Sequence, residues 1–593
     1  MKNILSNIKL IFEIFILSHK FDPKITLYEF LHGICLNLRK VLNVLMPACI
    51  INSIVDGKKW NVVIVLAVIY GGLQCIFSCG EKCFKHLQEA HGFRACNLLR
   101  LSMNKKFMRM DYADTENSQI MDSFEEAKDS MWEFADVGYV LFDDIIGNLI
   151  TFICMSYILM DVNPFVYAIV LGMVSLNVGI YHKKNKYVHD SDLKEKILKK
   201  WMNYMTGLMQ NYEVGKEIRI YNANRYMLQK YNFYADNYRN QIKEREKNIA
   251  RFSVVQGILS FVQLLVVYLS AIRKYILGNL KIGSFLLYVS SINELTESVR
   301  NLLAACIELT KVSFYYKDYV EYMDIPEKMW NSGEEKPEKA GTGIIELKNV
   351  SFYYPGCKEA AVKNVSMSIR HGERVGIVGE NGSGKSTLIK LLLRLYDPSE
   401  GAIYFNGKDI RLYEYRSYLN LFKAVFQDFA IFSYSILENI VFDNNIDLER
   451  LNTIMDMTGF GNQISKYAKG LDSMVTKVLS DDGIILSGGE QQLLAITRTF
   501  YHEAEVVIFD EPTAALDPIK EADVYKMIEK VSNEKTRIFC AHRMSSTKFC
   551  DKIVVLDRGG IIETGIHDEL MELKGTYYDL FTKQASLYKT NNV

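Results

Sequence analysis

The stretch that decides the fold of the C-terminal part is Gly379-Glu380-Asn381-Gly382-Ser383-Gly384-Lys385-Ser386-Thr387. It matches the pattern G-x-x-x-x-G-K-[ST] and lies between the apolar run Val375–Val378 and the run Leu388–Leu393. This order predicts a strand, a glycine loop and a helix whose N-terminus binds phosphate together with the N–H groups of the loop. In such a loop, Lys385 reaches the β- and γ-phosphates and the Ser386 hydroxyl binds Mg²⁺. The sequence therefore predicts a nucleotide-phosphate site.

Length and composition place this site in a larger, mixed chain. The 593 residues are too many for one hydrophobic core, so we expect several domains. Lys and Arg number 70, as do Asp and Glu, and the resulting net charge of zero gives no support for a nucleic-acid partner. The 11 cysteines form no C-x-x-C motif and no Cys/His cluster, which predicts reduced thiols rather than a metal site.

The N-terminal half contains six apolar stretches, each close to the ~20 residues that a membrane-spanning helix needs. They cover residues 27–54, 60–80, 137–160, 164–181, 252–272 and 282–305. A shorter apolar segment at 3–18 predicts an amphipathic helix in the membrane interface. The long loops 81–136 and 182–251 are rich in Lys and Arg, which predicts that they and both termini are cytoplasmic. We expect a multi-pass protein of the cell membrane.

Ionisable residues within these stretches are candidates for function. Glu297 and Arg300 are three positions apart, and we expect them to pair with each other. Asp143, Asp144 and Glu294 have no local partner in the sequence. Two interpretations stay open: they line an acidic path for cationic cargo, or they face a wet cytoplasmic vestibule.

After a linker at 322–343, rich in charge, Pro and Gly, short β-type runs alternate with helical patterns, which indicates an α/β domain. Apart from the glycine loop, this domain carries six further motifs with chemical potential: Tyr354, Gln427, Leu486–Gln492, Val506–Glu511, Ala514–Asp517 and His542.

With Leu486-Ser487-Gly488-Gly489-Glu490 as the most specific member, this motif set resembles the ATP-binding cassette (ABC) superfamily. Six spans fused N-terminal to the cassette resemble an exporter-type half-transporter. The resemblance implies an all-α polytopic membrane domain at 1–321, a linker at 322–343 and, at 344–593, an α/β P-loop NTPase cassette with antiparallel β and helical subdomains. It implies ATP hydrolysis coupled to export of a peptide, lipid or amphipathic small molecule by alternating access.

The resemblance also implies a role for each matching residue. The ATP is held by Gly379 to Thr387, with Tyr354 stacked on adenine. Mg²⁺ lies near Ser386, Gln427 and Asp510, Glu511 polarises the attacking water, and His542 and Lys385 contact the γ-phosphate. Ser487, Gly488, Gly489 and Glu490 close over the ATP of a second cassette, and Asp517 also lies at the nucleotide. A dimer is therefore implied, and helix tips near Ala113 and Ile220 match the family's coupling helices.

Two departures from the family pattern leave the partner open. Glu490 stands where the family usually has Gln, and Val478–Gly483 departs from the usual glycine–acid–arginine–glycine stretch. The second half-transporter is therefore either the same chain or a homologous one. An importer or gated channel built on the same spans is the alternative function, and a soluble cassette ATPase is a remote one. No peptidase domain precedes the first span, so we do not expect leader cleavage by this chain.

Overall fold

The computed structural model describes residues 2–129, 131–162, 164–211, 214–277, 281–338, 344–512, 518–532, 535–540 and 544–589. The chain divides into two compact units. The first unit comprises Met1–Asn104 and Asp122–Met323, and the second comprises Lys105–Met121 and Asp324–Val593. A short segment from the N-terminal half is thus part of the C-terminal unit.

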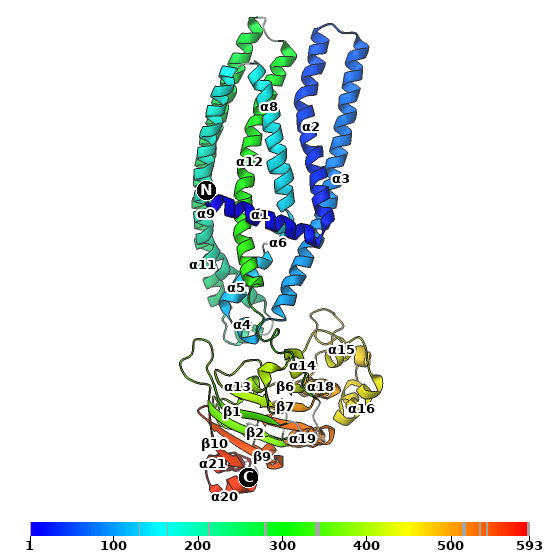
Figure 1. Cartoon of the computed structure of the whole chain (residues 1–593), viewed down its shortest axis with the longest axis vertical. Helices are drawn as coiled ribbons and strands as arrows, with labels where there is room; N and C mark the ends of the chain where they lie inside the picture. Colours follow the sequence, from blue (N-terminus) through cyan, green and yellow to red (C-terminus); the bar gives the residue numbers. More distant parts are fainter. Residues whose placement is uncertain are drawn as a thin grey trace. The chain divides into compact units, whose positions relative to one another are not determined.

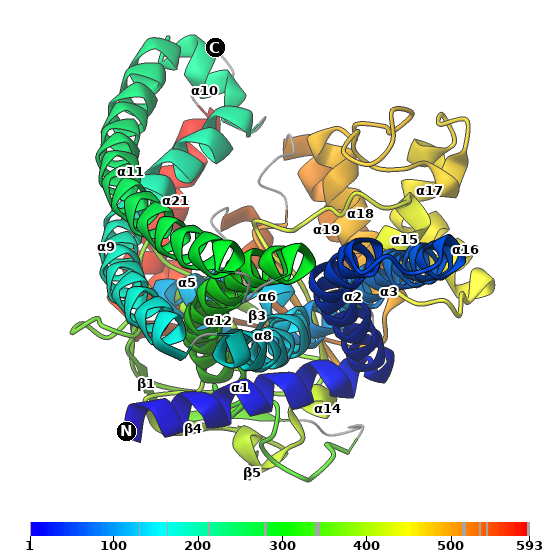
Figure 2. The same ribbon diagram turned by 90° about the horizontal axis from the view of Figure 1, so that it is seen from above.

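Every element that the structure describes in the first unit is a helix. The helices that contain the six predicted spans or parts of them include α2 (Pro23–Val55), α3 (Trp60–Phe107), α8 (Asn148–Val162), α9 (Pro164–Gln210), α11 (Asn224–Ile276) and α12 (Ile282–Met323). The other helices are α1 (Lys2–Phe21), α5 (Ser118–Asp129), α6 (Met131–Ala135), α7 (Val137–Tyr139) and α10 (Gly215–Ile220). Helices α2 and α3 run side by side, as do α9 and α11, which are joined at one end through α10 (Figures 1 and 2).

Four helical stretches of the described residues are long and apolar enough to cross a bilayer: Pro23–Val55, Trp60–Phe107, Val137–Met160 and Asn224–Ile276. The predicted spans 164–181 and 282–305 lie within α9 and α12, which are not among these four stretches. The chain is a multi-pass membrane protein, and the count of six spans stays a prediction. The predicted interfacial segment 3–18 lies within α1, which crosses the bundle (Figure 1).

The third apolar stretch contains a feature that its sequence pattern does not indicate. Residues Val140–Gly147 form a π-helix between α7 and α8. In a π-helix, main-chain hydrogen bonds span five residues instead of four, and the ladder changes where it meets an α-helix. The buried Asn148 amide donates to the carbonyl oxygens of Asp143 and Asp144, at 3.1 and 3.0 Å. This side chain therefore satisfies carbonyl groups at the junction.

Polar partners also hold α2 against this π-helix. His32 Nδ1 lies 2.6 Å from Asp143 Oδ2, and both side chains are buried. A Cβ atom on Gly33 would lie 2.5 Å from the other Asp143 oxygen, so only glycine allows this approach. Asp143, for which the sequence shows no local partner, thus has one 111 positions away and does not line an open path. Glu297 and Arg300 pair at 2.9 Å, which confirms the prediction made for them.

The second unit contains two sheets. The antiparallel sheet has the strand order β2-β1-β4-β5, and the other sheet has the order β10-β9-β3-β8-β7-β6. The strands are β1 (Ile345–Phe352), β2 (Val362–Ile369), β3 (Arg374–Val378), β4 (Glu400–Phe405), β5 (Lys408–Asp409), β6 (Phe422–Val425), β7 (Val506–Asp510), β8 (Thr536–Cys540), β9 (Lys552–Asp557) and β10 (Gly560–Gly565). Strands β9, β3, β8, β7 and β6 are parallel, and β10 is antiparallel to β9.

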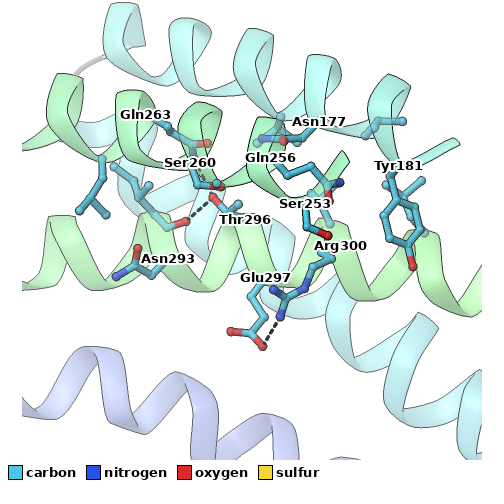
Figure 3. A pocket seen from close by; sticks show the side chains of 17 residues that line it. Asn177, Tyr181, Ser253, Gln256, Ser260, Gln263, Asn293, Thr296, Glu297 and Arg300 are labelled. Atoms are coloured by element: carbon cyan, nitrogen blue, oxygen red, sulfur yellow. Dashed lines mark hydrogen bonds and ion pairs between the residues drawn. The ribbon is translucent and has the colours of Figure 1, made fainter. Parts of the chain in front are cut away.

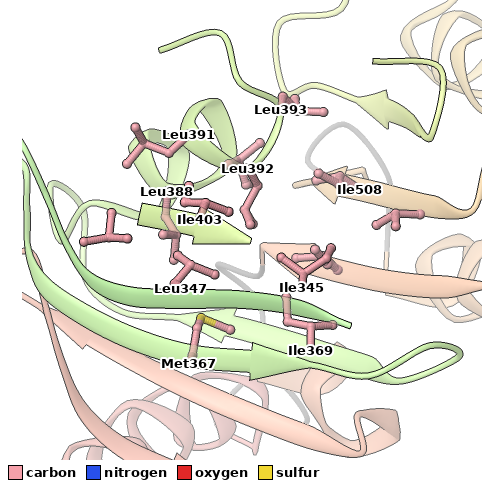
Figure 4. Packing of buried hydrophobic residues seen from close by; sticks show 14 of the residues in the cluster. Ile345, Leu347, Met367, Ile369, Leu388, Leu391, Leu392, Leu393, Ile403 and Ile508 are labelled. Atoms are coloured by element: carbon pink, nitrogen blue, oxygen red, sulfur yellow. The ribbon is translucent and has the colours of Figure 1, made fainter. Parts of the chain in front are cut away.

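Burial on both faces explains the apolar runs of the central strands. All five residues of β7 and of β8 are buried, as expected for parallel strands that are covered on both sides. One face packs with α13 (Lys385–Leu392) against the antiparallel sheet, through a core that includes Leu347, Leu388, Leu392 and Ile508 (Figure 4). The other face packs against α18 (Gly488–Tyr501), α19 (Pro518–Val531) and α21 (Thr576–Lys589).

A separate core supports a helical subdomain. It contains side chains of α15 (Ile436–Val441), α16 (Leu448–Thr458), α17 (Phe460–Ile464) and α18. The remaining helices of the unit are α4 (Tyr112–Thr115), α14 (Tyr415–Leu419) and α20 (His567–Leu573), with 3₁₀ turns at Ile410–Leu412, Gly470–Asp472 and Met544–Phe549. The expected combination of parallel sheet, antiparallel sheet and helical subdomain is therefore present.

Candidate functional site

The glycine loop has the conformation that its sequence predicts. It leaves the end of β3 and leads directly into α13. Gly382 and Gly384 have φ angles of +80° and +101°, a region that favours glycine. A Cβ atom on Gly384 would lie 2.5 Å from the carbonyl oxygen of Ala361. Glu380 and Asn381 are exposed at the tip, and Ser383 is buried. The loop thus leaves its backbone open to a ligand at the N-terminus of α13.

Lys385 is held in this loop by its own backbone. The ammonium group donates to the carbonyl oxygens of Gly379 and Glu380, both at 2.9 Å. The side chain is 6% exposed, and its burial lowers the pKa of Lys385, against the influence of Cys540, Glu511 and Asp510. A buried cation above a loop of N–H groups is a suitable partner for an anionic phosphate chain.

The next two residues of α13 differ in exposure. The Ser386 side chain is exposed, whereas Thr387 is buried and its Oγ1 lies 3.1 Å from the Tyr354 hydroxyl. Tyr354 also contacts the ring of Tyr396 edge-on, with the centroids 5.5 Å apart. The structure therefore places the aromatic residue predicted for adenine beside the glycine loop, with its ring partly exposed.

The paired carboxylates lie at the end of β7. Asp510 is the last residue of the strand and is 8% exposed. Glu511 follows with φ +50°, and its N–H donates to the Cys540 carbonyl on β8 at 3.2 Å. Burial raises the pKa of Glu511, whereas Lys385 lowers it. This left-handed turn directs Glu511 away from the strand at the sheet edge where β3 also ends.

Gln427 joins the same group from the neighbouring strand. It follows β6 by two residues, and its Nε2 donates to Glu511 Oε2 at 2.9 Å. Strands β3, β8, β7 and β6 are adjacent and parallel, so their carboxyl ends meet at one edge of the sheet. Lys385, Asp510, Glu511 and Gln427, which are far apart in sequence, are thereby brought together.

The residues predicted for a metal fit a hard cation. Ser386, Gln427 and Asp510 offer a hydroxyl, an amide oxygen and a carboxylate, and Mg²⁺ prefers such oxygen ligands. Only one of the three is ionised, and the part of the chain that the structure describes holds no group of three or more His, Cys, Asp or Glu that could bind a metal by itself. This donor set is typical of a metal bound together with substrate phosphates.

The signature residues form the N-terminus of α18. Ser487 is the N-cap, and a capping box links it to Glu490: the Glu490 N–H donates to Ser487 Oγ, and the Ser487 N–H donates to Glu490 Oε2 at 2.8 Å. Ser487 and Gly488 are exposed and Gly489 is half-buried, whereas Glu490 is buried. The helix terminus therefore presents free N–H groups and a hydroxyl to solvent.

Two residues that the sequence analysis did not single out surround Glu490. Lys466 forms an ion pair with the Glu490 carboxylate, and the Tyr467 hydroxyl lies 3.3 Å from both of its oxygens. Burial alone raises the pKa of Glu490, but the hydrogen bonds from Lys466 and Ser487 outweigh it and lower the pKa to about 2. Glu490, which stands where the family usually has Gln, is thus charged and has the Lys466 cation beside it.

The stretch before the signature is a tight turn. Thr476 has φ +69°, and a Cβ atom on Gly483 would lie 1.8 Å from the Thr476 carbonyl oxygen. The backbone around it pairs Thr476 with Ile484 at 2.8 Å. Two predicted site residues, Asp517 and His542, lie outside the described residues, and so does the whole Ala514–Asp517 motif.

The short helix α4 belongs to this unit and packs near the glycine-loop helix. Ala113 contacts the core, and the ring of Tyr112 meets that of Tyr396 edge-on at 5.7 Å. The Tyr396 hydroxyl donates to the Glu116 carboxylate, and Lys390 of α13 lies 3.6 Å from the same carboxylate. The hydrogen bond from Tyr396 lowers the pKa of Glu116. The other predicted tip, near Ile220, lies in the first unit, where Ile220 and Tyr221 are both 78% exposed.

Comparisons with known proteins agree with this arrangement. Residues 362–514 match the family model described as ABC transporter. The chain is 28% identical to the subtilin transport ATP-binding protein of Bacillus subtilis, over 94% of this chain and 91% of that protein. It is 33% identical to the ATP-dependent lipid A-core flippase of Vibrio vulnificus (strain CMCP6), over 55% of each chain. A solved structure of a bacterial Atm1-family ABC exporter with ATP bound has the same fold, with a TM-score of 0.74, 20% identity and 98% coverage of each chain.

Proposed function

Because the chain is an exporter-type half-transporter of the ABC transporter superfamily that couples ATP hydrolysis to transport, we propose that it works in the cell membrane as a dimer of half-transporters. The cassette and both termini are cytoplasmic in this proposal. The observation that carries it is the division of the nucleotide machinery within one chain. The glycine loop, Lys385, Gln427 and Glu511 gather at one sheet edge, whereas Ser487 lies exposed on a separate helix terminus.

Each composite site takes its two halves from different chains. The backbone of Gly379 to Gly384 and the ammonium of Lys385 bind the β- and γ-phosphates of ATP, and Tyr354 packs against adenine. Ser487, Gly488 and Gly489 of the partner subunit complete the site with N–H groups at a helix N-terminus. Two such sites close when ATP is bound and open after hydrolysis, so the nucleotide shifts the population between closed and open cassettes.

Within the closed site, Glu511 orients the attacking water and accepts its proton. The hydrogen bond from Gln427 holds one carboxylate oxygen at 2.9 Å, and the burial that raises the pKa of Glu511 makes the carboxylate a better base. Ser386, Gln427 and Asp510 hold Mg²⁺, which neutralises charge on the phosphates when bound. His542 contacts the γ-phosphate, and Asp517 lies beside the nucleotide.

The cargo in our proposal is a peptide. The relative named for subtilin transport aligns over nearly the whole chain, through both the spans and the cassette. The flippase aligns over little more than half. Similarity that extends through the helical unit is more informative about cargo than similarity limited to the motor, because the spans form the transport path.

Transport in inside-out vesicles tests the proposal. Vesicles containing the full chain are expected to hydrolyse ATP and accumulate a labelled peptide in their lumen, and Glu511→Gln vesicles are expected to do neither. Hydrolysis that drives peptide outward from the lumen would instead identify an importer. A chain that hydrolyses no ATP, alone or with a homologous half-transporter encoded by the same genome, would contradict the proposal.

A further inference from the structure

A polar cavity lies within the first unit, between α9, α11 and α12. Its volume is about 650 Å³, within the range of about 300–1,000 Å³ that is usual for ligand pockets. Figure 3 shows Asn177 of α9, Gln256, Ser260 and Gln263 of α11, and Asn293 and Thr296 of α12 around it. Amide and hydroxyl groups are thus gathered on three helices of a membrane domain, where they are costly unless they have partners.

One of these amides lacks a partner on its acceptor side. Gln263 is 2% exposed, and its Nε2 donates to Thr296 Oγ1 at 2.7 Å. Thr296 in turn donates to the Ile292 carbonyl at 2.8 Å, which fixes the direction of the chain of hydrogen bonds. The Gln263 Oε1 atom is buried and has no hydrogen-bond partner among the described residues. It is therefore available as an acceptor to a bound group.

A second helix offers the complementary atom. Asn177 Nδ2 is also buried and has no hydrogen-bond partner among the described residues. The cavity therefore carries one unused acceptor and one unused donor, on different helices. A peptide backbone presents one N–H donor and one C=O acceptor per residue, and both need partners when they leave water.

The charge of the wall points to a neutral ligand. The two charged side chains that line the cavity, Glu297 and Arg300, form an ion pair with each other at 2.9 Å. Apolar side chains complete the lining: Val174, Val178, Leu264, Ile292, Val299 and Leu303. A free anion or cation would find no unpaired counter-charge in this lining, whereas an uncharged peptide segment with small apolar side chains matches both the amides and the apolar surface.

We propose that this cavity is a cargo subsite in which Gln263 Oε1 accepts from, and Asn177 Nδ2 donates to, the backbone of an uncharged peptide segment. The inference rests on the proposed peptide-export function and adds the part of the peptide that is recognised, namely backbone amides rather than charged side chains. A lipid acyl chain would leave both atoms unpaired.

Binding to the full-length chain in nanodiscs tests this without ATP. The probe is an N-acetylated, C-amidated pentapeptide of alanine and valine carrying a fluorophore, and its counterpart has every backbone nitrogen methylated. We expect saturable binding of the first peptide and at least tenfold weaker binding of the second, because methylation removes the N–H groups. Equal binding of the two peptides, no binding of the first, or displacement of the first by lysophospholipid at equal concentration would overturn the proposal.

Variants identify the subsite. Gln263→Leu and Asn177→Leu replace the amide with apolar atoms, and each is expected to weaken peptide binding at least tenfold. Asn185→Leu is the matched control, since Asn185 lies on α9 outside the cavity and also has a buried Nδ2 without a hydrogen-bond partner among the described residues. Its binding should equal that of the wild type.

A measurement of ATP hydrolysis in the same nanodiscs distinguishes failure of the proposed function from failure of the proposed subsite. Loss of hydrolysis in the unmodified chain contradicts the proposed function, whereas unchanged peptide binding in both cavity variants contradicts the subsite alone. The methylated peptide needs no variant, so the subsite remains testable even if a leucine variant does not fold.

Discussion

Glu511 combines a strained backbone, a hydrogen bond from Gln427 and a carboxylate made more basic by burial. Glu511→Gln keeps the shape and removes the base, so we expect ATP binding to persist. General-base catalysis contributes about 10²- to 10⁴-fold, and turnover should fall by about this factor. Phosphate release measures turnover, and nucleotide retention measures binding. Glu505→Gln, just before β7, is the control and should behave as the wild type; residual hydrolysis above about a tenth in Glu511→Gln would assign the base elsewhere.

At the signature, Lys466 should compensate for the charge that Glu490 introduces. In our proposal the signature lies beside the γ-phosphate of the ATP bound by the partner subunit, so Lys466→Met would leave a carboxylate there without its cation, and like charges repel. We expect a several-fold fall in ATPase activity, little change in Glu490→Gln, and recovery in the double variant. Lys469→Met removes an exposed ion pair with Asp482 and should have no effect. A double variant as impaired as Lys466→Met would show that Lys466 acts otherwise.

The same carboxylate gives a pH dependence of stability. The pKa of Glu490 is lowered from 4.5 to about 2, so its ionised form stabilises the fold fully above pH 4.5. This contribution is lost as the pH falls toward about 2. Thermal unfolding of the full chain in detergent should therefore lose stability more steeply on acidification in the wild type than in Glu490→Gln. Parallel curves would mean that Glu490 is not held in its charged form.

The sequence predicts the conformation of a segment where the residues of that segment determine it by themselves. The glycines at 382 and 384 require positive φ angles, and the apolar run before them has to be a buried strand, so β3 and α13 were predictable. The ion pair of Lys466 with Glu490 was not predictable, because only the packing of the helical subdomain brings the two residues together. Nor was the pairing of Asp143 with His32, which joins residues 111 positions apart. The roles of Asp517 and His542 stay predictions.

At the scale of elements, the π-helix Val140–Gly147 depends on one side chain. The Asn148 amide donates to two carbonyl groups of this π-helix. Asn148 is only 2% exposed, so Asn148→Ala leaves these carbonyl groups without this donor in a buried place. Such a loss costs about 1–3 kcal/mol, which should lower the unfolding temperature of the chain in detergent. Ser175→Ala, whose exposed hydroxyl bonds its own helix, is the control. Equal unfolding temperatures would show that another donor replaces the amide.

Helix α4 should carry motion between the ATP site and α3, because it packs near α13 and the chain runs directly from α3 into it. Tyr396→Phe keeps the ring contact with Tyr112 but loses the hydrogen bond to Glu116, worth about 1.5–3 kcal/mol for a charged acceptor. We expect hydrolysis to continue while transport per ATP falls. Tyr404→Phe on β4 is the control. Equal losses of hydrolysis and transport would indicate a folding defect rather than uncoupling.

For the whole molecule, the exposed N-terminus of α18 at Ser487 predicts that ATP drives association of the cassettes. The Glu511→Gln chain, expressed alone and supplied with ATP, should give a particle of twice the chain mass by mass photometry and keep two nucleotides. Binding energy from each trapped nucleotide favours the closed dimer. Particles of single mass that become double only with a homologous chain would identify an obligate heterodimer.

The inclusion of residues 105–121 in the C-terminal unit also has a consequence for biogenesis. Glu116 and Tyr396 are 280 positions apart, so α4 leaves the ribosome long before the surface that receives it exists. At about 5–20 residues per second, the delay is roughly 15–60 s. During this interval Tyr112 and Ala113 are exposed on the nascent chain, next to α3, which is inserted into the membrane earlier. Ribosome pausing or chaperone binding within this window should therefore determine the yield of native protein more than events at the chain's end.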